Sequence, residues 1–293
     1  MRFLPLSLLV LTMIFVACQR DPQDLEIIVI EDNTAPPDLN VPLVIKQNYI
    51  NKLYISLLGR KPTFVENEAA LATLDGDNAS ISTRKNLIAQ VQSEIAYYER
   101  QYEIARVEIL NNLDTADITT QISIYQSLKQ DPRYADFIEL IEYEQQRLIR
   151  LKQVPNALPS KLINRIEMHR RCADNSIYDE INMGTQNFVL SLFETFLGRY
   201  PTVAEEAAAS QMVDGINTIF FGEEGDSKTE MIEIFFDSDN YYEGAVLEIY
   251  EDFLFRSPNS VEMSEATKLY RLSGDYEELL QEILSSDEYM GLD

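Results

Sequence analysis

The sequence predicts an all-α fold, a helical repeat of three helix-corner-helix units with a long helical hairpin or bundle inserted after the first unit. The strongest observation is that QNYINKLYISLLGRKPTFVE at residues 47–66 returns as QNFVLSLFETFLGRYPTVAE at residues 186–205, with nine of twenty positions identical. A third copy, AVLEIYEDFLFRSPNSVE, covers residues 245–262. In addition, apolar side chains recur at helical spacing along most of the chain from Leu43 onward.

Residues 1–17 predict a lipoprotein signal peptide. Arg2 precedes a mainly apolar run that is too short to span a bilayer. The segment FVAC resembles a bacterial lipobox, in which cleavage leaves Cys18 carrying a diacylglycerol and a further acyl chain such as palmitate. Several acyl chains make a stable anchor, because each buried methylene contributes about 0.8 kcal/mol. The alternative is an ordinary cleaved signal in which Cys18 is incidental.

Residues 18–42 predict a tether that holds the body of the protein away from the membrane, because four prolines and four aspartates interrupt this segment. By resemblance to known sorting rules, Gln19 after the cysteine favours the outer membrane. The stretch QRDPQD resembles the export tether of surface lipoproteins in Bacteroidetes-type cells. The periplasmic and the cell-surface face both stay open.

The charge balance excludes nucleic acid as a partner. The chain has 49 acidic and 24 basic residues and a net charge of −25, so it repels nucleic acid and anionic headgroups. If Cys18 is acylated, Cys172 is the only other cysteine, and no disulfide within the chain can form.

The repeated segment predicts a corner between two helices. Gly59 suits the left-handed end of the first helix, Pro62 stops that helix, and Thr63 with Glu66 forms a capping box for the next one. Arg60 can bind the last carbonyls of the first helix, pair with a carboxylate of its own unit or contact a partner. In the third copy Phe255 replaces the glycine. The predicted corner residues are Gly59, Arg60, Pro62, Thr63, Glu66, Gly198, Arg199, Pro201, Thr202, Glu205, Arg256, Pro258, Asn259 and Glu262.

The insertion separates the first two copies. We expect one long helix over residues 83–113, a second over Tyr134–Val154 after a break at Asp131-Pro132, and a third from Ser160 to Cys172. The insertion either projects as a hairpin and contacts a partner or is more of the packed body. The basic residues predicted to contact an acidic partner are Arg147, Arg150, Lys152, Arg165, Arg170 and Arg171.

Each unit ends in a serine, an acidic residue and a tyrosine, as in QSEIAYYE, DSDNYYEG and SSDEYMG. The predicted boundaries are 1–17 signal peptide, 18–42 tether, 43–99 first unit, 100–183 insertion, 184–244 second unit and 245–293 third unit. With these endings, LYISLLGRKPT, LFETFLGRYPT and IYEDFLFRSPN resemble a helical repeat domain of unknown function, similar to phycobilisome linkers, in secreted and S-layer-associated bacterial proteins. They also look like the GRxPT helical domain that precedes cytochrome-associated modules in Planctomycete-type proteins. The resemblance implies assembly and extracellular attachment.

Few residues suggest chemistry. His169 and Cys172 lie three residues apart on one predicted helix, but zinc and haem sites need further ligands, so we expect no metal, no cofactor and no catalytic residue. The loops that begin at Asp75 and Asp237 start like calcium-binding loops but lack the required glycine and final glutamate. We therefore expect them to be helix caps or solvated loops.

Two function classes follow. Three copies of one helical unit favour a non-catalytic cell-envelope lipoprotein that serves as an adaptor or structural subunit of an outer-membrane or surface assembly. Its partners would be the membrane, through the lipid anchor, and other envelope proteins. The alternative is an envelope enzyme or ligand-binding lipoprotein. A deep cleft lined by acidic residues, His169 or tyrosines would favour this alternative.

Overall fold

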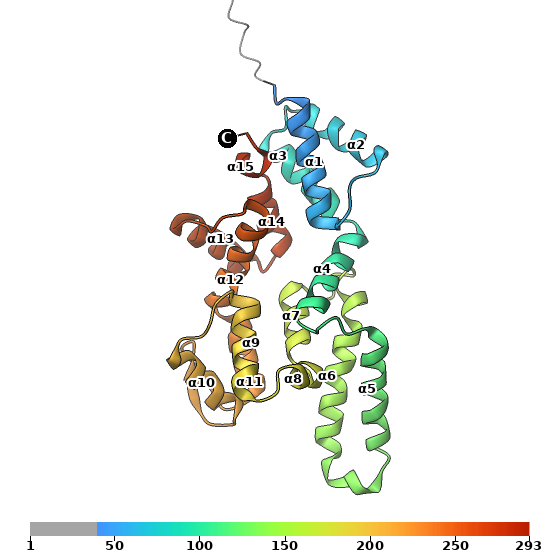
Figure 1. The fold of residues 1–293 in the computed structure, drawn as a ribbon, viewed down its shortest axis with the longest axis vertical. Helices are drawn as coiled ribbons and strands as arrows, with labels where there is room; N and C mark the ends of the chain where they lie inside the picture. Colours follow the sequence, from blue (N-terminus) through green and yellow to red (C-terminus); the bar gives the residue numbers. More distant parts are fainter. Residues whose placement is uncertain (1–39, 293) are drawn as a thin grey trace, which may run out of the picture. The chain divides into compact units, whose positions relative to one another are not determined.

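Helices dominate residues 40–292, the part of the chain that the computed structural model describes (Figure 1). Within this part there are fifteen α-helices, one 3-10 helix (η1), one π-helix (η2) and one two-stranded hairpin. The predominantly helical fold class is therefore confirmed. The hairpin corrects the expectation of a purely α-helical chain.

The N-terminal segment forms four helices, α1 (Leu43–Leu58), α2 (Phe64–Asp75), α3 (Ile81–Gln92) and α4 (Ile95–Glu108). The single helix predicted over residues 83–113 is wrong, because the chain breaks between α3 and α4. At the break Ser93 Oγ donates a hydrogen bond to the carbonyl of Gln90, and Glu94 has extended backbone angles. A serine that bonds to the preceding turn competes with the continuing helix.

The insertion contains a helical hairpin of α5 (Thr115–Leu128) and α6 (Ile138–Ala157), which lie side by side (Figure 1). Between them η1 (Pro132–Phe137) begins where the Asp131 carboxylate accepts the N–H of Arg133. The predicted helix over Tyr134–Val154 therefore starts later, at Ile138, and it runs past Pro155 to Ala157. Next come α7 (Arg165–Ala173) and α8 (Ser176–Ile181). Because the Asn164 side chain caps α7, this helix begins five residues after the predicted Ser160.

The C-terminal segment starts with α9 (Thr185–Leu197) and α10 (Val203–Val213), and the antiparallel strands β1 (Thr218–Phe220) and β2 (Glu223–Gly225) follow. Phe221 and Gly222 turn between the strands with φ angles of 50° and 88°, which is the conformation of a tight hairpin turn. The remaining elements are α11 (Lys228–Asp237), α12 (Asp239–Ile249), η2 (Tyr250–Leu254), α13 (Ser260–Ser273), α14 (Tyr276–Leu284) and α15 (Asp287–Met290).

The first and last helices of this part pack against each other. Helix α3 contacts α14, and α1 contacts α15. The buried Tyr49 hydroxyl donates to the carbonyl of Leu284 at 3.0 Å, and the buried Arg84 pairs with Asp287 at 2.6 Å. Residues about 200 positions apart thus share one core. The contact between the first and last helices also brings helices from distant parts of the chain around one cavity.

Candidate functional site

An arginine paired with a glutamate six residues later holds each of the three predicted corners. The guanidinium donates to both carboxylate oxygens in every case, so of the alternatives for these arginines the pairing with a carboxylate of the same unit is observed. The pairs are Arg60 with Glu66, Arg199 with Glu205 and Arg256 with Glu262, at distances between 2.7 and 2.9 Å.

The same arginines reach a second partner that the sequence analysis missed. Arg60 contacts Glu94 at 3.2 Å, Arg199 contacts Asn240 at 3.0 Å, and Arg256 contacts Glu288 at 2.6 Å. All three partners belong to the serine-acid-tyrosine endings. The sequence could therefore have indicated these second contacts, because each ending carries a polar residue shortly after its serine. The arginine joins the corner to the helix that begins at the ending.

The capping residues and the helix ends complete the corners. Thr63, Thr202 and Asn259 each accept a hydrogen bond from the N–H of the glutamate in their capping box. Gly59, Gly198 and Phe255 end the preceding helices with left-handed φ angles of 70°, 61° and 56°. Pro62, Pro201 and Pro258 lie in the short non-helical links between these ends and the caps.

The corners also hold carboxylates in the charged form. Hydrogen bonds from Arg60, with a smaller contribution from Thr63, lower the pKa of Glu66 to about 2. Arg199 and Thr202 lower the pKa of Glu205 to about 2 in the same way. Each of these glutamates therefore stabilises the fold at pH values above the pKa that its side chain has in the unfolded chain, and this contribution is lost as the pH falls through its lower pKa in the fold.

Two of the basic residues predicted to contact a partner, Arg147 and Arg165, are engaged in the core, so the prediction is wrong for these two and stays a prediction for the others. Arg147 is only 4% exposed and pairs with Glu144 and Asp174 at 2.8 Å. Arg165 is 11% exposed and pairs with Glu248. Burial and pairing in the core explain why neither presents a free charge.

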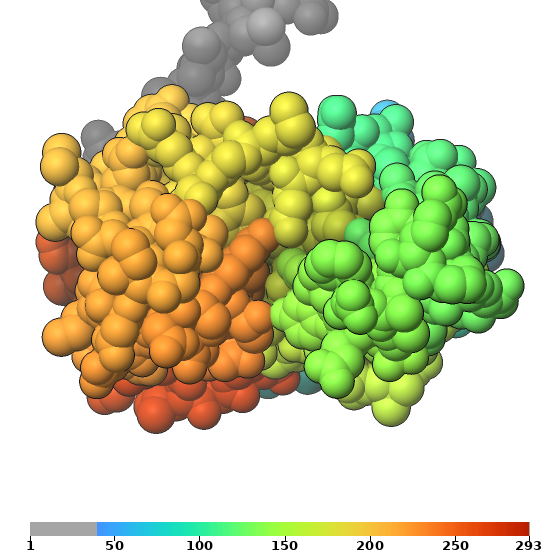
Figure 2. Space-filling model, turned by 90° about the horizontal axis from the view of Figure 1, so that it is seen from below, coloured from blue at the N-terminus to red at the C-terminus, as the bar shows by residue number. Residues whose placement is uncertain are grey.

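The rest of this set lies nearer the surface. Arg170 pairs with Asp237 at 2.9 Å, and Arg171 pairs with Glu167 at 2.7 Å. Arg150 is half exposed, and Lys152 is partly buried. Arg147, Arg150, Arg170 and Arg171 line a hollow of about 230 Å³ between α6 and α11, which separates the hairpin from the C-terminal helices on the face in Figure 2.

The acidic loops have structural partners. Asp75 pairs with Lys46 at 2.6 Å, and Asp77 accepts a hydrogen bond from Ser80. Asp237 pairs with Arg170, and Asp239 with Arg271. In residues 40–292 no group of three acidic, histidine or cysteine side chains converges closely enough to hold a metal ion.

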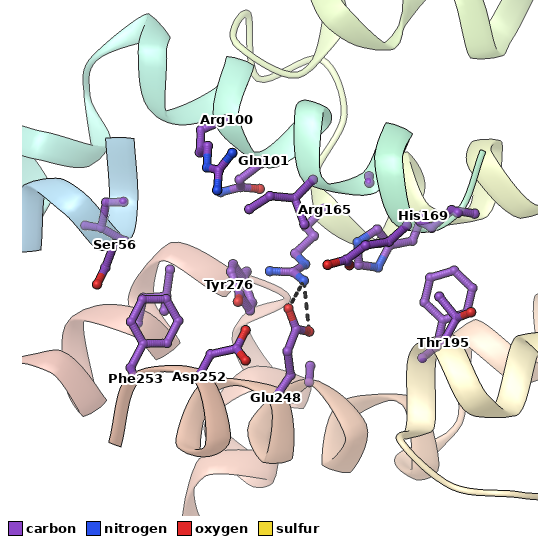
Figure 3. Close-up of a pocket in the computed structure, with 18 of the residues that line it drawn as sticks. Ser56, Arg100, Gln101, Arg165, His169, Thr195, Glu248, Asp252, Phe253 and Tyr276 are labelled. Atoms are coloured by element: carbon purple, nitrogen blue, oxygen red, sulfur yellow. Dashed lines mark hydrogen bonds and ion pairs between the residues drawn. The ribbon is translucent and has the colours of Figure 1, made fainter. Parts of the chain in front are cut away.

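A cavity of about 410 Å³ lies where α1, α4, α7, α9, α12, η2 and α14 meet (Figure 3). Its volume is in the range of small-molecule sites. Its lining combines aromatic rings with charged side chains from helices far apart in the sequence. We take this central cavity as the candidate functional site.

An ion pair forms one wall of the central cavity. Arg165 on α7 donates to both carboxylate oxygens of Glu248 on α12, at 2.6 and 2.9 Å (Figure 3). The guanidinium carbon also lies 3.9 Å from the centre of the Tyr276 ring. A planar guanidinium suits both contacts at once. Arg165 is thereby fixed, and its charge is matched by Glu248.

His169 and Cys172 lack the features of a catalytic pair. The ring Nδ1 of His169 is 2.9 Å from the Tyr241 hydroxyl, and burial together with the charge of Arg165 holds the pKa of His169 well below its usual range. Burial raises the pKa of Cys172 to about 12, so its thiol stays protonated. A protonated, buried thiol is a poor nucleophile.

Three buried polar atoms in the lining have no hydrogen-bond partner in the described part of the chain. They are the Tyr97 hydroxyl, Gln101 Oε1 and Arg165 Nε. Tyr97 is 2% exposed and Gln101 is 9% exposed. Buried polar atoms are nearly always hydrogen-bonded in folded proteins, so these atoms indicate a missing polar partner such as a ligand or water.

Two carboxylates at the mouth, Glu108 on α4 and Asp252 on η2, form no ion pair or hydrogen bond with another residue of the described part. Partial burial, with the nearby charges of Glu248 and Asp252, raises the pKa of Glu108. Partial burial and Glu248 raise the pKa of Asp252. The charges of Arg165 and Arg100 oppose this shift for Glu108 and that of Arg165 opposes it for Asp252, yet both pKa values stay raised, so the mouth concentrates carboxylates that no ion pair neutralises.

The carboxylates of the cavity were not predicted from the sequence, although one signal was available for Glu248 and Asp252. Tyr241, Ala245, Glu248 and Asp252 all line the cavity and follow each other at spacings of four, three and four residues. This spacing marks one face of a helix. Two acidic residues on a face that otherwise carries core residues pointed to a polar cavity, but the facing helices could not be predicted.

Comparison with models of protein families, with curated proteins and with solved structures gave no match. The resemblance to phycobilisome-linker-like repeats therefore stays a prediction. Cys18 and the predicted signal peptide lie outside the described residues, so both stay predictions. Within residues 40–292 no helix has both the length and the apolar character needed to cross a membrane.

Proposed function

We propose that the protein is a non-catalytic cell-envelope lipoprotein that binds a small polar ligand in the central cavity. One observation carries this proposal, the presence of buried polar atoms without partners in a cavity that also has charged and aromatic walls. Binding without catalysis is favoured because Cys172 is buried in its thiol form and His169 is occupied by Tyr241. An enzyme that uses a cysteine nucleophile would need an activated thiol here.

The cellular location and the architecture predicted from the sequence belong to the proposed function. Cys18 would carry the lipid anchor, residues 18–42 would be the tether, and the protein would lie at the outer membrane. The three helix-corner-helix units with an inserted hairpin are supported by the recurring arginine–glutamate pairs and by their second contacts with the unit endings. A repeat of this kind suits extended helical surfaces.

A thermal-shift screen tests ligand binding. The full chain would be purified in detergent and mixed with a panel of amines, carboxylates, sugars and capped amino acids. A ligand at 100 times its dissociation constant stabilises a protein by about 2.7 kcal/mol. We expect at least one panel member to raise the melting temperature.

Two tryptophan variants show whether such a shift comes from the central cavity. Thr195 lines the cavity and is exposed, so Thr195→Trp fills part of the space from its rim. The neighbouring Glu194 is exposed and does not line it, so Glu194→Trp is the matched control. The shift should vanish in Thr195→Trp and persist in Glu194→Trp. No shift with any compound, or an equal shift in both variants, would refute the proposal.

A second candidate function is that of an adaptor or structural subunit that contacts other envelope proteins. Exposed apolar side chains near the turn of the hairpin favour it, namely Tyr134, Phe137, Ile138 and Leu140. Exposed apolar patches of this kind mark contacts between proteins. An apolar groove on another envelope protein would be the matching partner.

A double variant tests the adaptor function without removing core residues. Phe137→Ser with Leu140→Ser changes two side chains that are 56% and 57% exposed, so the fold should persist. Crosslinking in native membranes, followed by mass spectrometry, should then lose the partners seen with the parent chain. The control is Leu272→Ser, which removes a leucine that is 78% exposed on α13, away from the hairpin. Retention of every partner by the double variant would contradict the adaptor role.

A further inference from the structure

We propose that the central cavity binds an organic cation, a primary alkylamine whose ammonium group is held by the carboxylates of Glu108 and Asp252. This inference rests on the proposed ligand-binding function and names the chemical class of the ligand. The charge around the cavity, its unpartnered hydrogen-bond acceptors and its apolar wall all favour such a ligand.

The charge around the cavity favours a cation. Among its lining residues Glu108, Glu248 and Asp252 are acidic, and Arg100 and Arg165 are basic. Arg165 and Glu248 neutralise each other through two hydrogen bonds. Arg100 is exposed at the rim, and the pKa of Glu108 stays raised despite its charge. One added positive charge would relieve the repulsion among the carboxylates.

The unpartnered atoms of α4 suit a donor. Gln101 Oε1 can only accept hydrogen bonds, and the Tyr97 hydroxyl can accept one as well. An ammonium group has three N–H donors and no acceptor. Figure 3 shows Gln101 on α4 facing the side of the cavity from which Asp252 and Glu248 project. A cationic donor that reaches this part of α4 would therefore satisfy a buried acceptor.

The remaining wall suits an alkyl chain. Phe253 and Leu57 line the cavity beside the polar groups, together with Ile104 and Leu280. Aliphatic chains pack well on such surfaces, and ammonium groups are attracted to aromatic faces. At about 410 Å³ the cavity has room for several methylene groups. A metal ion fits less well, because no three ligating side chains of the described part converge on one point.

The same chemistry occurs in a free diamine and in the lysine side chain of a partner protein. Isothermal titration calorimetry on the full chain in detergent distinguishes these sources. The probes are putrescine and N-acetyl-lysine methylamide, with 1,4-butanediol and succinate as neutral and anionic controls. We expect putrescine to bind and both controls to give no heat. Binding of the capped lysine at least as tight as that of putrescine assigns the site to a protein partner.

Charge-removing variants test which residues hold the cation. Glu108→Gln and Asp252→Asn should each weaken putrescine binding by about tenfold, the value of one partly exposed charge-assisted hydrogen bond. Glu251→Gln is the matched control, because Glu251 is exposed in the same turn but does not line the cavity. Binding should also weaken as salt rises from low to physiological concentration. Circular dichroism spectra establish that each variant is folded.

The outcomes separate this inference from the proposal on which it rests. Binding of succinate without putrescine would overturn the cationic ligand and leave ligand binding in place. Unchanged putrescine affinity in both Glu108→Gln and Asp252→Asn would move the site elsewhere and overturn the inference. A third result is that neither putrescine nor the capped lysine gives heat, while another panel compound gives a melting-temperature shift that Thr195→Trp abolishes. That result would reject the cationic ligand and leave ligand binding in the cavity in place.

Discussion

Replacing Arg256 by alanine tests whether the corners stabilise the fold. Arg256 donates five hydrogen bonds, two to Glu262, two to Glu288 and one to the carbonyl of Ser257. Arg256→Ala removes all of them and leaves two carboxylates close together. Of the three corner arginines, this one has two carboxylates held by paired hydrogen bonds.

The expected loss is about 2 kcal/mol in the free energy of unfolding. Exposed ion pairs contribute about 0.2 to 1 kcal/mol each, whereas hydrogen bonds to charged groups contribute about 1.5 to 3 kcal/mol when water is excluded. The side chains of Arg256, Glu262 and Glu288 are between 28% and 36% exposed, so each pair lies near the top of the exposed range. Two such ion pairs together give the expected loss of about 2 kcal/mol. For a body of this size the melting temperature should fall by roughly 4 to 8 °C.

The assay is urea denaturation at neutral pH, followed by circular dichroism. Arg133→Ala is the control, because Arg133 also pairs with an aspartate but is 81% exposed, and we expect no measurable change from it. Arg256→Lys keeps the charge but loses the paired geometry, so it should recover less than half of the loss. A denaturation midpoint for Arg256→Ala equal to that of the parent would refute the stabilising role.

Acid gives a second readout of the same substitution. Hydrogen bonds from Arg256 lower the pKa values of both Glu262 and Glu288. Their contribution is therefore present above the unfolded pKa of about 4.3 and is lost as pH falls through the lower folded values. The stability difference between the parent and Arg256→Ala should shrink below about pH 4. A difference that stays constant from pH 7 to pH 3 would mean that the arginine acts through packing alone.

Three further substitutions test other features. Phe255→Gly should stabilise the protein by roughly 0.5 to 1 kcal/mol in urea denaturation, because Phe255 is exposed and left-handed, where glycine is favoured; a loss of stability would show that its ring packs usefully. Gly244→Ala should destabilise by about 3 kcal/mol or more, since a Cβ there would lie 2.2 Å from the carbonyl oxygen of Phe196; an unchanged melting temperature would contradict this close approach. Cys18→Ala should release the protein from membranes or stall its processing; normal fractionation and maturation would reject the lipid anchor.

Local features were predictable from the sequence where one segment determines them. Thr63 with Glu66 and Thr202 with Glu205 form capping boxes because all the atoms involved lie within four residues. The break at Ser93 was missed because the apolar pattern continues through it. The hairpin at Phe221-Gly222 was missed because a phenylalanine rarely takes a left-handed conformation.

The central cavity was not predictable, because its walls come from segments that no local pattern connects. Arg165 and Glu248 are 83 residues apart, and Tyr276 lies still further along the chain. Helical periodicity shows that Arg165 and His169 share a face but not which helix that face meets. Arg147 and Arg165 were expected to contact a partner because basic residues concentrate in this part of an acidic chain, and charge pattern alone does not show that an arginine is paired in the core.

The contact between the first and last helices connects stability with the cavity. The buried Arg84 of α3 pairs with Asp287 at the start of α15, and the next residue, Glu288, pairs with Arg256. Helix α14 lies directly before this point and carries Tyr276, whose ring packs on Arg165. Helix α14 also packs against α3 directly, so a change that separates α3 from both α14 and α15 should loosen the ring that packs on Arg165. The third corner and the central cavity therefore depend on the same short C-terminal segment, and the ligand proposed for the cavity should also strengthen the contact between the two ends of the helical body.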